Sequence, residues 1–483
     1  MSIQPATNTP PKPPIHWPSL LQLIFSSLAA VLLFGLAAIL EVTGLSQFFA
    51  GGTASATFIQ PFMVAGSLVF AGVLVIPSAW YAWRNIAHAG FEPVSRPESR
   101  YFGLILTVVV LVVVSGTLLL GNWISKNDRI SWFLLPILNI IATGLPALWV
   151  IYFGTRGLLP NKPRHTWGVF ASGLILGPTI ILILELILLV VVGIFAFLWI
   201  RLNPSVSNQL NGLMFRLQNG VPDTQTIIRT FLPFLLNPVV IFLGFATISV
   251  LVPIIEESFK PLGLWFMVGQ KITPAQGFGF GVLSGAAFGL FENLGNTSNS
   301  GTDWALLAGS RVSTLLLHSF TAGLIGWALA SAWTQRRFLR LAVSFTIAIL
   351  IHGTWNGLAV LSAAGSLEGV TSVPLPAGLQ QIGTLAMVGI FALGLLVLVL
   401  FFAFNSVLRH SIPSPLPPES ISMQPSIVLA GPSQPFQSLE SSALPSDASD
   451  STSLPTDNPS RSEADPQHLP LGEESTHTTE TIE

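Results

Sequence analysis

The chain has 483 residues, of which 51% are hydrophobic and only 9% are charged. A soluble domain carries about 25% charged residues, so the composition excludes an ordinary soluble protein and indicates a membrane protein with several spans. The formal net charge is −2 and there is no cysteine, which excludes disulfide bonds, thiol catalysis and cysteine-bound metals.

Apolar segments recur along the chain at the length of about 20 residues that a helix needs to cross a bilayer. The expected fold class is therefore an all-α membrane protein, a polytopic bundle of about ten transmembrane helices. When the Lys and Arg residues of alternating loops are summed, the excess lies on the side of the N-terminus, which predicts that both termini face the cytoplasm. The predicted spans cover residues 19–40, 59–83, 101–123, 132–153, 167–200, 231–269, 275–295, 304–334, 339–363 and 380–404.

Polar segments divide the chain into five predicted regions. The segment between the two groups of spans mixes polar and apolar residues, and either an interfacial amphipathic helix or an ordinary loop fits it. The C-terminal segment is rich in Ser, Pro and acidic residues without apolar periodicity, which predicts a disordered tail. The regions are an N-terminal cytoplasmic tail (1–17), a five-span bundle (18–200), an extracytoplasmic loop (201–230), a second bundle (231–404) and the acidic tail (411–483).

Two of the predicted spans have a composition that is unusual for a transmembrane helix. The fifth span contains Glu185 in an otherwise aliphatic stretch, and we expect a protonated hydrogen-bond partner for a neighbouring helix there. The seventh span, 275–295, is dense in glycine, and glycines four residues apart let helix backbones approach closely. This span is therefore expected near the centre of the bundle.

The sixth span contains three charged residues, Glu256, Glu257 and Lys260. A charge at bilayer depth costs from about 2.5 to more than 10 kcal/mol, so three of them require an explanation. Lys260 lies four residues after Glu256 and three after Glu257, so its ammonium can reach both carboxylates on one helical face. A structural ion pair would need only one glutamate, which favours a functional site.

The next three spans each add an ionisable group. These are Glu292, His318 and His352, and the two histidines are the only ones of eight that fall inside spans. His318 and His352 lie at a depth comparable to that of the glutamate pair, about 20 Å from a span end at 1.5 Å per residue. Histidines and glutamates that share one depth on adjacent helices predict a common site.

Two further polar residues share a helical face with these histidines. Asn356 follows His352 by four residues, so the two can share a ligand or a water molecule. Arg311 precedes His318 by seven residues, which also places them on one face, with Arg311 nearer the outer surface.

Together these residues form a set of motifs over about residues 250–360, and the set resembles the PrsW family of intramembrane proteases, which is related to the CAAX prenyl protease and bacteriocin-processing superfamily. The resemblance implies a membrane-embedded peptidase that cleaves a membrane-anchored substrate, which in the founding members is an anti-sigma factor. It also assigns supporting positions to Asn293 and Arg311. The motifs are Glu256-Glu257-x-x-Lys260, Phe291-Glu292-Asn293, Arg311 to His318, and His352-Gly-Thr-Trp-Asn356.

Peptide hydrolysis inside a membrane needs a base that activates water, a group that stabilises the oxyanion and a proton donor for the amine. Glu257 or Glu256 would activate the water, and His318 or His352 with Asn356 would stabilise the oxyanion or donate the proton. Lys260 would offset the charge of the glutamate pair.

A zinc ion is the alternative to a metal-free site, with Glu257, Glu292, His318 and His352 as candidate ligands. The chain has no HExxH motif, which excludes one zinc protease type and favours the metal-free mechanism. No predicted span contains aspartate, so an aspartyl pair is excluded as well.

Two other classes of function use the same residue types. A proton-coupled transporter or channel would use the glutamates and histidines as a relay, although the spans show no two-half repeat. A non-catalytic scaffold would keep the fold and bind a partner through its tail. For the protease, the expected partners are the bilayer and a membrane-anchored, possibly single-span, regulatory protein, with no nucleic acid. The expected location is the plasma (inner) membrane of a prokaryote.

Overall fold

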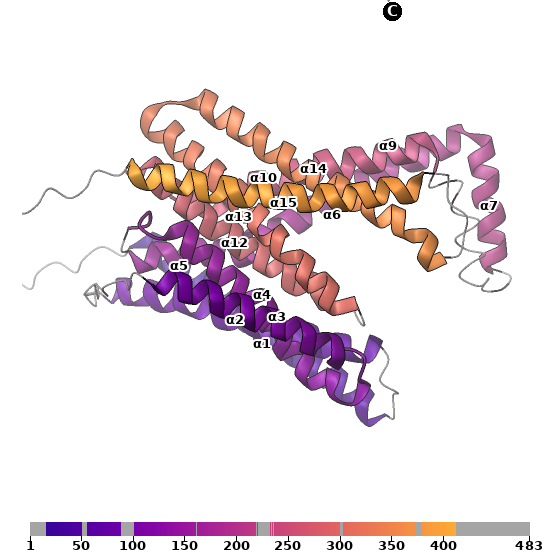
Figure 1. Cartoon of the computed structure of the whole chain (residues 1–483), viewed down its shortest axis with the longest axis horizontal. Coiled ribbons are helices and arrows are strands. Elements are labelled where there is room, and N and C mark those ends of the chain that lie inside the picture. Colours follow the sequence, from indigo (N-terminus) through magenta and orange to yellow (C-terminus); the bar gives the residue numbers. More distant parts are fainter. Residues whose placement is uncertain are drawn as a thin grey trace, which may run out of the picture. The chain divides into compact units, whose positions relative to one another are not determined.

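The computed structural model describes residues 16–50, 56–87, 101–160, 162–218, 220, 232, 234, 236–299, 303–371 and 378–411. Residues Met1–Ser414 form one compact unit, and every regular element within its described part is a helix, which confirms the all-α class (Figure 1). Most of the predicted N-terminal tail, residues 221–230 of the predicted loop and nearly all of the acidic tail lie outside the described residues.

The helices follow the predicted order of spans. They are α1 (Trp17–Phe49), α2 (Ala56–Ile86), α3 (Phe102–Ile124), α4 (Asp128–Thr155), α5 (Pro163–Ala171), α6 (Gly177–Leu202), α7 (Pro204–Gln218), α9 (Pro238–Ala246), α10 (Val252–Phe259), α11 (Leu262–Trp265), α12 (Pro274–Thr297), α13 (Trp304–Gln335), α14 (Phe338–Thr371) and α15 (Leu379–His410), with π-helical turns η1 (Ser172–Leu176) and η2 (Thr247–Leu251).

Nine helical segments of the described chain are long and apolar enough to cross a membrane. They match nine of the ten predicted spans, and the largest change of boundary is in the span predicted at 231–269, where the membrane-length helical segment covers Pro238–Phe259. The chain turns after Lys260, where Pro261 and the short helix α11 follow. Proline lacks the N–H group that would continue the helix, which accounts for the early end.

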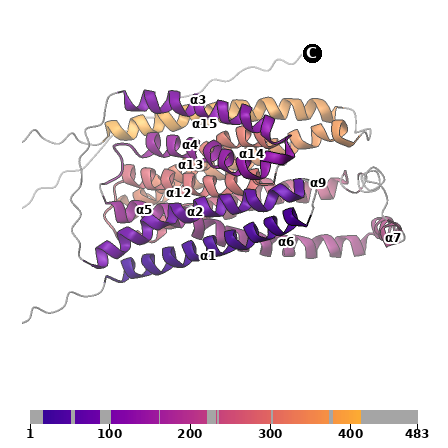
Figure 2. The ribbon, with the colours of Figure 1, turned by 90° about the horizontal axis from the view of Figure 1, so that it is seen from below.

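The remaining predicted span, the seventh (275–295), is α12, which is a helix but falls short of the apolarity of the others. Its side chains are buried along nearly the whole helix, so protein rather than lipid surrounds it. A helix in that position needs no apolar surface toward lipid. α1 begins and α15 ends at the same end of the bundle (Figure 2), as an even number of crossings, α12 included, requires.

The glycines of α12 bring it into backbone contact with α13. A Cβ atom at Gly277, Gly281 or Gly285 would collide with a backbone carbonyl oxygen of α13, and the carbonyl at Gly285 belongs to His318. Close approach at small residues is the usual way that membrane helices pack. The predicted central position of this helix is confirmed, and the packing fixes the backbone from which His318 projects.

Two predictions about polar segments have different outcomes. Residues 204–218 form the helix α7, on which Phe215 is exposed, so the prediction of an ordinary loop is wrong for this stretch.

Glu185 on α6 is partly buried, and within the described chain its carboxylate makes no hydrogen bond. The predicted hydrogen bond to a neighbouring helix is therefore not found among the described residues.

Candidate active site

Lys260 lies at the centre of the polar cluster, one residue beyond the end of α10. Its side chain is fully buried, and its Nζ atom is 2.7 Å from Glu257 Oε1 and 3.0 Å from Glu256 Oε2. The same atom is 2.8 Å from His318 Nδ1 and 3.2 Å from His352 Nδ1. The predicted pairing of Lys260 with both glutamates is present, and two histidines from α13 and α14 complete the surroundings of the ammonium.

The two glutamates of the pair differ in their surroundings. Glu257 is completely buried, and its Oε1 atom accepts hydrogen bonds from Lys260 Nζ and from Thr321 Oγ1, the latter at 3.1 Å. His352 Nδ1 lies 2.9 Å from the same oxygen. The side chain of Glu256 is 12% exposed, so only this member of the pair reaches the surface of the cluster.

A second chain of contacts leads from His318 toward the C-terminal end of α12. His318 Nε2 lies 2.7 Å from Glu292 Oε2, and Glu292 Oε1 lies 2.5 Å from Arg311 Nη2. Arg311 Nε donates a hydrogen bond to Asn293 Oδ1 at 2.8 Å, and the Asn293 amide donates to the Arg311 carbonyl oxygen. Arg311 and Asn293 therefore fix the carboxylate of Glu292, which in turn fixes the ring of His318.

The hydrogen-bond network assigns the protons of both histidines. An ammonium has three N–H groups, and Lys260 Nζ has hydrogen-bond geometry to Glu257 Oε1, His318 Nδ1 and His352 Nδ1, with Glu256 Oε2 as an ion-pair partner. His318 Nδ1 thus accepts from Lys260, while its Nε2–H donates to Glu292. His352 Nδ1 lies closer to Glu257 Oε1, at 2.9 Å, than to Lys260 Nζ, at 3.2 Å. A carboxylate can only accept, so we assign a proton to His352 Nδ1, which donates it to Glu257. This inference from the network leaves His352 Nε2 as an acceptor.

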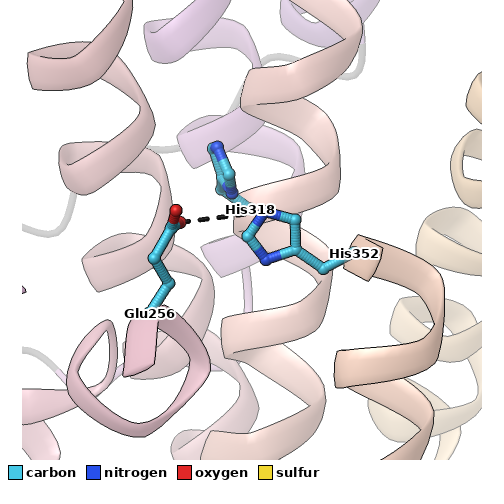
Figure 3. A group of neighbouring side chains, drawn as sticks. All are labelled: Glu256, His318 and His352. Atoms are coloured by element: carbon cyan, nitrogen blue, oxygen red, sulfur yellow. Dashed lines mark ion pairs between the residues drawn. The ribbon is translucent and has the colours of Figure 1, made fainter. Parts of the chain in front are cut away.

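The remaining acceptor of His352 lies near Glu256, the glutamate of the pair that keeps a small exposed fraction. His352 Nε2 lies 3.8 Å from Glu256 Oε2, which is too long for a direct hydrogen bond but suits a group held between the two atoms. Figure 3 shows the side chains of Glu256, His318 and His352 directed toward one another from α10, α13 and α14. The arrangement can hold and deprotonate a small polar group at this point.

All five predicted site residues lie in this one connected network: Glu256, Glu257, Glu292, His318 and His352. Asn356 does not take the expected place beside a ligand of His352. Its amide instead donates a hydrogen bond of 3.1 Å to the carbonyl oxygen of Ile248, within the π-turn η2 that precedes α10. A π-turn shifts the hydrogen-bond register of a helix, so Asn356 stabilises the turn that orients the glutamate pair.

Two residues of the network were absent from the sequence prediction. Thr321, which donates to Glu257, follows His318 by three residues on the same helical face, and this spacing could have identified it. Ser284 Oγ donates a hydrogen bond of 2.6 Å to the backbone carbonyl oxygen of Lys260. This contact depends on where the chain turns after α10, for which the sequence carried no signal beyond Pro261.

A metal ion could be held by the buried group of Glu256, His318 and His352, because their ligand atoms all lie within 4.8 Å of one another. Carboxylate and imidazole are ordinary zinc ligands. However, the ammonium of Lys260 lies within 3.2 Å of an atom of each of the three. With Lys260 in this position, the residues do not fit an added metal ion.

Comparison with known proteins identifies the part of the chain that carries this site. Residues 220–379 match the model of the PrsW family intramembrane metalloprotease. No curated protein and no solved structure matches the chain. The matched residues include the glutamate pair, Glu292 and both histidines. Residues 220–379 are therefore a PrsW-family intramembrane protease domain.

Proposed function

We propose that the protein cleaves a peptide bond of a membrane-anchored protein substrate, with Glu256 as the general base. The observation that carries this assignment is the difference between the two adjacent glutamates: the side chain of Glu256 is 12% exposed and that of Glu257 is not exposed at all. A base must come within hydrogen-bond reach of the water it activates, directly or through one other water. Of the two adjacent glutamates, only Glu256 has any exposed side-chain surface, and the other partly exposed carboxylate, Glu292, is held between Arg311 and His318.

His352 is the second group in contact with the attacking water. Its Nε2 atom, 3.8 Å from Glu256 Oε2, accepts one hydrogen of the water while Glu256 takes the other as a proton. The oxygen then forms a bond with the carbonyl carbon of the substrate. Glu256 returns the proton to the amide nitrogen as the C–N bond breaks, so the carboxylate is regenerated.

Lys260 supplies the positive charge of the site. Its ammonium lies 3.0 Å from Glu256 and 2.7 Å from Glu257, so it offsets the charge of the two carboxylates. A fixed positive charge in a site of low dielectric also stabilises negative charge that develops on the substrate oxygen. A metal would supply the same kind of stabilisation, and no step above depends on one.

The remaining network serves to position these groups. Glu257 holds Lys260 and the Nδ1–H of His352, and Glu292 holds His318 against the ammonium from the other side. The distribution of Lys and Arg between the loops supports a topology with both termini on the cytoplasmic side of the membrane.

The proposal is tested by cleavage of candidate single-span membrane proteins in reconstituted membranes by wild-type protein and by Glu256→Gln. We expect a defined cleavage product within or next to the substrate's span with wild-type protein and none above background with the variant. A proton flux across the vesicle membrane that requires Glu256, with no cleavage of any substrate, would support the transporter class instead.

A further inference from the structure

The position of Lys260 bears on whether this site takes a metal ion. Each of the three side chains that could hold a metal has an atom close to Lys260 Nζ. The distances from Nζ are 3.0 Å to Glu256 Oε2, 2.8 Å to His318 Nδ1 and 3.2 Å to His352 Nδ1. We infer that the Lys260 ammonium is a built-in cation that occupies the place of a metal ion, so that lysine and metal exclude each other from this site.

The chemistry of the donors supports mutual exclusion. A zinc ion binds lone pairs of carboxylate oxygen and imidazole nitrogen. In this site the Lys260 ammonium already lies 3.0 Å from Glu256 Oε2 and donates to the lone pair of His318 Nδ1 at 2.8 Å. A divalent ion bound to the same atoms would lie next to the fully buried positive charge of Lys260, and repulsion between like charges is strong in a medium of low dielectric.

The surroundings of Lys260 hold its side chain in place. The side chain is fully buried, and the ring of Phe288 lies against it, with Nζ 5.0 Å from the ring centroid. Ser284 fixes the backbone carbonyl of Lys260, and Thr321 fixes the carboxylate that pairs with it. An incoming metal ion would therefore have to displace an ammonium that contacts four polar side chains and one aromatic ring.

Removal of the Lys260 ammonium should leave its former partners able to bind another cation. Without it, Glu256, Glu257 and His318 lose an N–H donor or a paired charge, while the three potential metal ligands keep their backbone positions. Glu256, His318 and His352 then form an open cation site. Lys260→Met keeps much of the length of the side chain and removes only its charge and donors, so this substitution should create a zinc site.

Metal content tests this directly. Full-length wild-type protein, Lys260→Met and Lys260→Met/His318→Ala are purified in detergent, incubated with zinc chloride and desalted, and bound zinc is measured by mass spectrometry. The matched control is Lys271→Met, which removes the same charge from an exposed position in the loop before α12. A parallel series with cobalt(II) reports ligand geometry through the visible absorption of the ion.

We expect no stoichiometric zinc in wild-type protein or Lys271→Met, and about one zinc per chain in Lys260→Met with loss of that zinc in the double variant. Cobalt should show a tetrahedral spectrum only in Lys260→Met. One zinc per wild-type chain, lost in Glu256→Gln, would overturn the inference, and this arm decides the question even if Lys260→Met does not fold. Folded Lys260→Met without bound zinc would also overturn it. Because no substrate is used, the result is independent of the proposed role of Glu256 in hydrolysis.

Discussion

Two buried polar clusters lie at helix junctions of this protein, and they differ in charge. One joins α2, α4 and α13 through neutral groups: Trp304 Nε1 donates to Asn139 Oδ1 at 3.0 Å, and the Asn139 amide donates to Ser67 Oγ at 3.3 Å. The other surrounds Lys260 and contains three carboxylates, an ammonium and two imidazoles.

The neutral cluster is closed, because Asn139, Ser67 and Trp304 are all buried. The charged cluster is open at two carboxylates, since the side chain of Glu256 is 12% exposed and that of Glu292 is 29% exposed. A neutral network can be sealed within a bundle at small cost when every donor has a partner. Charges at this depth are costly even when paired, and their partial exposure is what chemistry on an outside molecule requires.

The largest effect on stability is expected from Lys260→Met. The substitution leaves Glu256 and Glu257 adjacent and without their shared cation, and breaking a buried ion pair from one side costs about 3–5 kcal/mol. Folded yield in detergent should fall sharply relative to Lys271→Met, with cleavage activity lost as well. A Lys260→Met protein that folds at wild-type yield without bound metal would show that the pair does not need a cation.

Most of the charged cluster could be predicted from the sequence, because ionisable residues inside apolar spans are rare enough to be counted. The four-residue and three-residue spacings to Lys260 placed it on the face of both glutamates, and the contacts in the structure agree. Glycine density placed α12 at the centre. What periodicity could not predict was the π-turn η2 before α10, or which of the two glutamates keeps a small exposed fraction.

Helical spacing also could not predict the hydrogen-bond partner of Asn356. Its four-residue spacing from His352 correctly gave a shared face, but not which group its amide bonds. The partner is a carbonyl of Ile248, more than a hundred positions away, and that contact exists because Gly353 lets α14 approach η2 closely: a Cβ atom at Gly353 would collide with the carbonyl oxygen of Ser249. Such long-range backbone contacts leave no periodic signal in the chain.

A substitution in the neutral cluster should lower the stability of the protein without changing its specific activity. Asn139→Ala removes the acceptor of Trp304 Nε1 and the donor to Ser67, and an unsatisfied buried donor costs about 1–3 kcal/mol. The melting temperature in detergent should therefore fall, while cleavage per folded molecule stays at the wild-type value. A loss of specific activity at constant stability would contradict the separation of the two clusters.

The smallest effect on stability is expected from Asn356→Ala, which removes one partly exposed hydrogen bond worth about 0.5–1.5 kcal/mol. Because that bond positions η2 ahead of Glu256, kcat should fall by about tenfold, as expected for a misplaced base, while KM changes little. Asn356→Gln, which keeps the amide, should recover part of the loss. A change in KM without a change in kcat would instead place Asn356 in contact with the substrate.

The central claim is that two adjacent glutamates have different roles, and one measurement compares them directly. Cleavage of a single-span substrate per folded molecule is measured in reconstituted membranes for Glu256→Gln and Glu257→Gln, with melting temperature recorded in parallel. Glu256→Gln should remain folded and lose about 10²-fold or more in turnover, which is the usual contribution of a general base. Glu257→Gln should lose stability, because Lys260 and His352 lose their shared charged acceptor, and should keep measurable activity per folded molecule. Full specific activity in folded Glu256→Gln would contradict the assignment of Glu256 as the base.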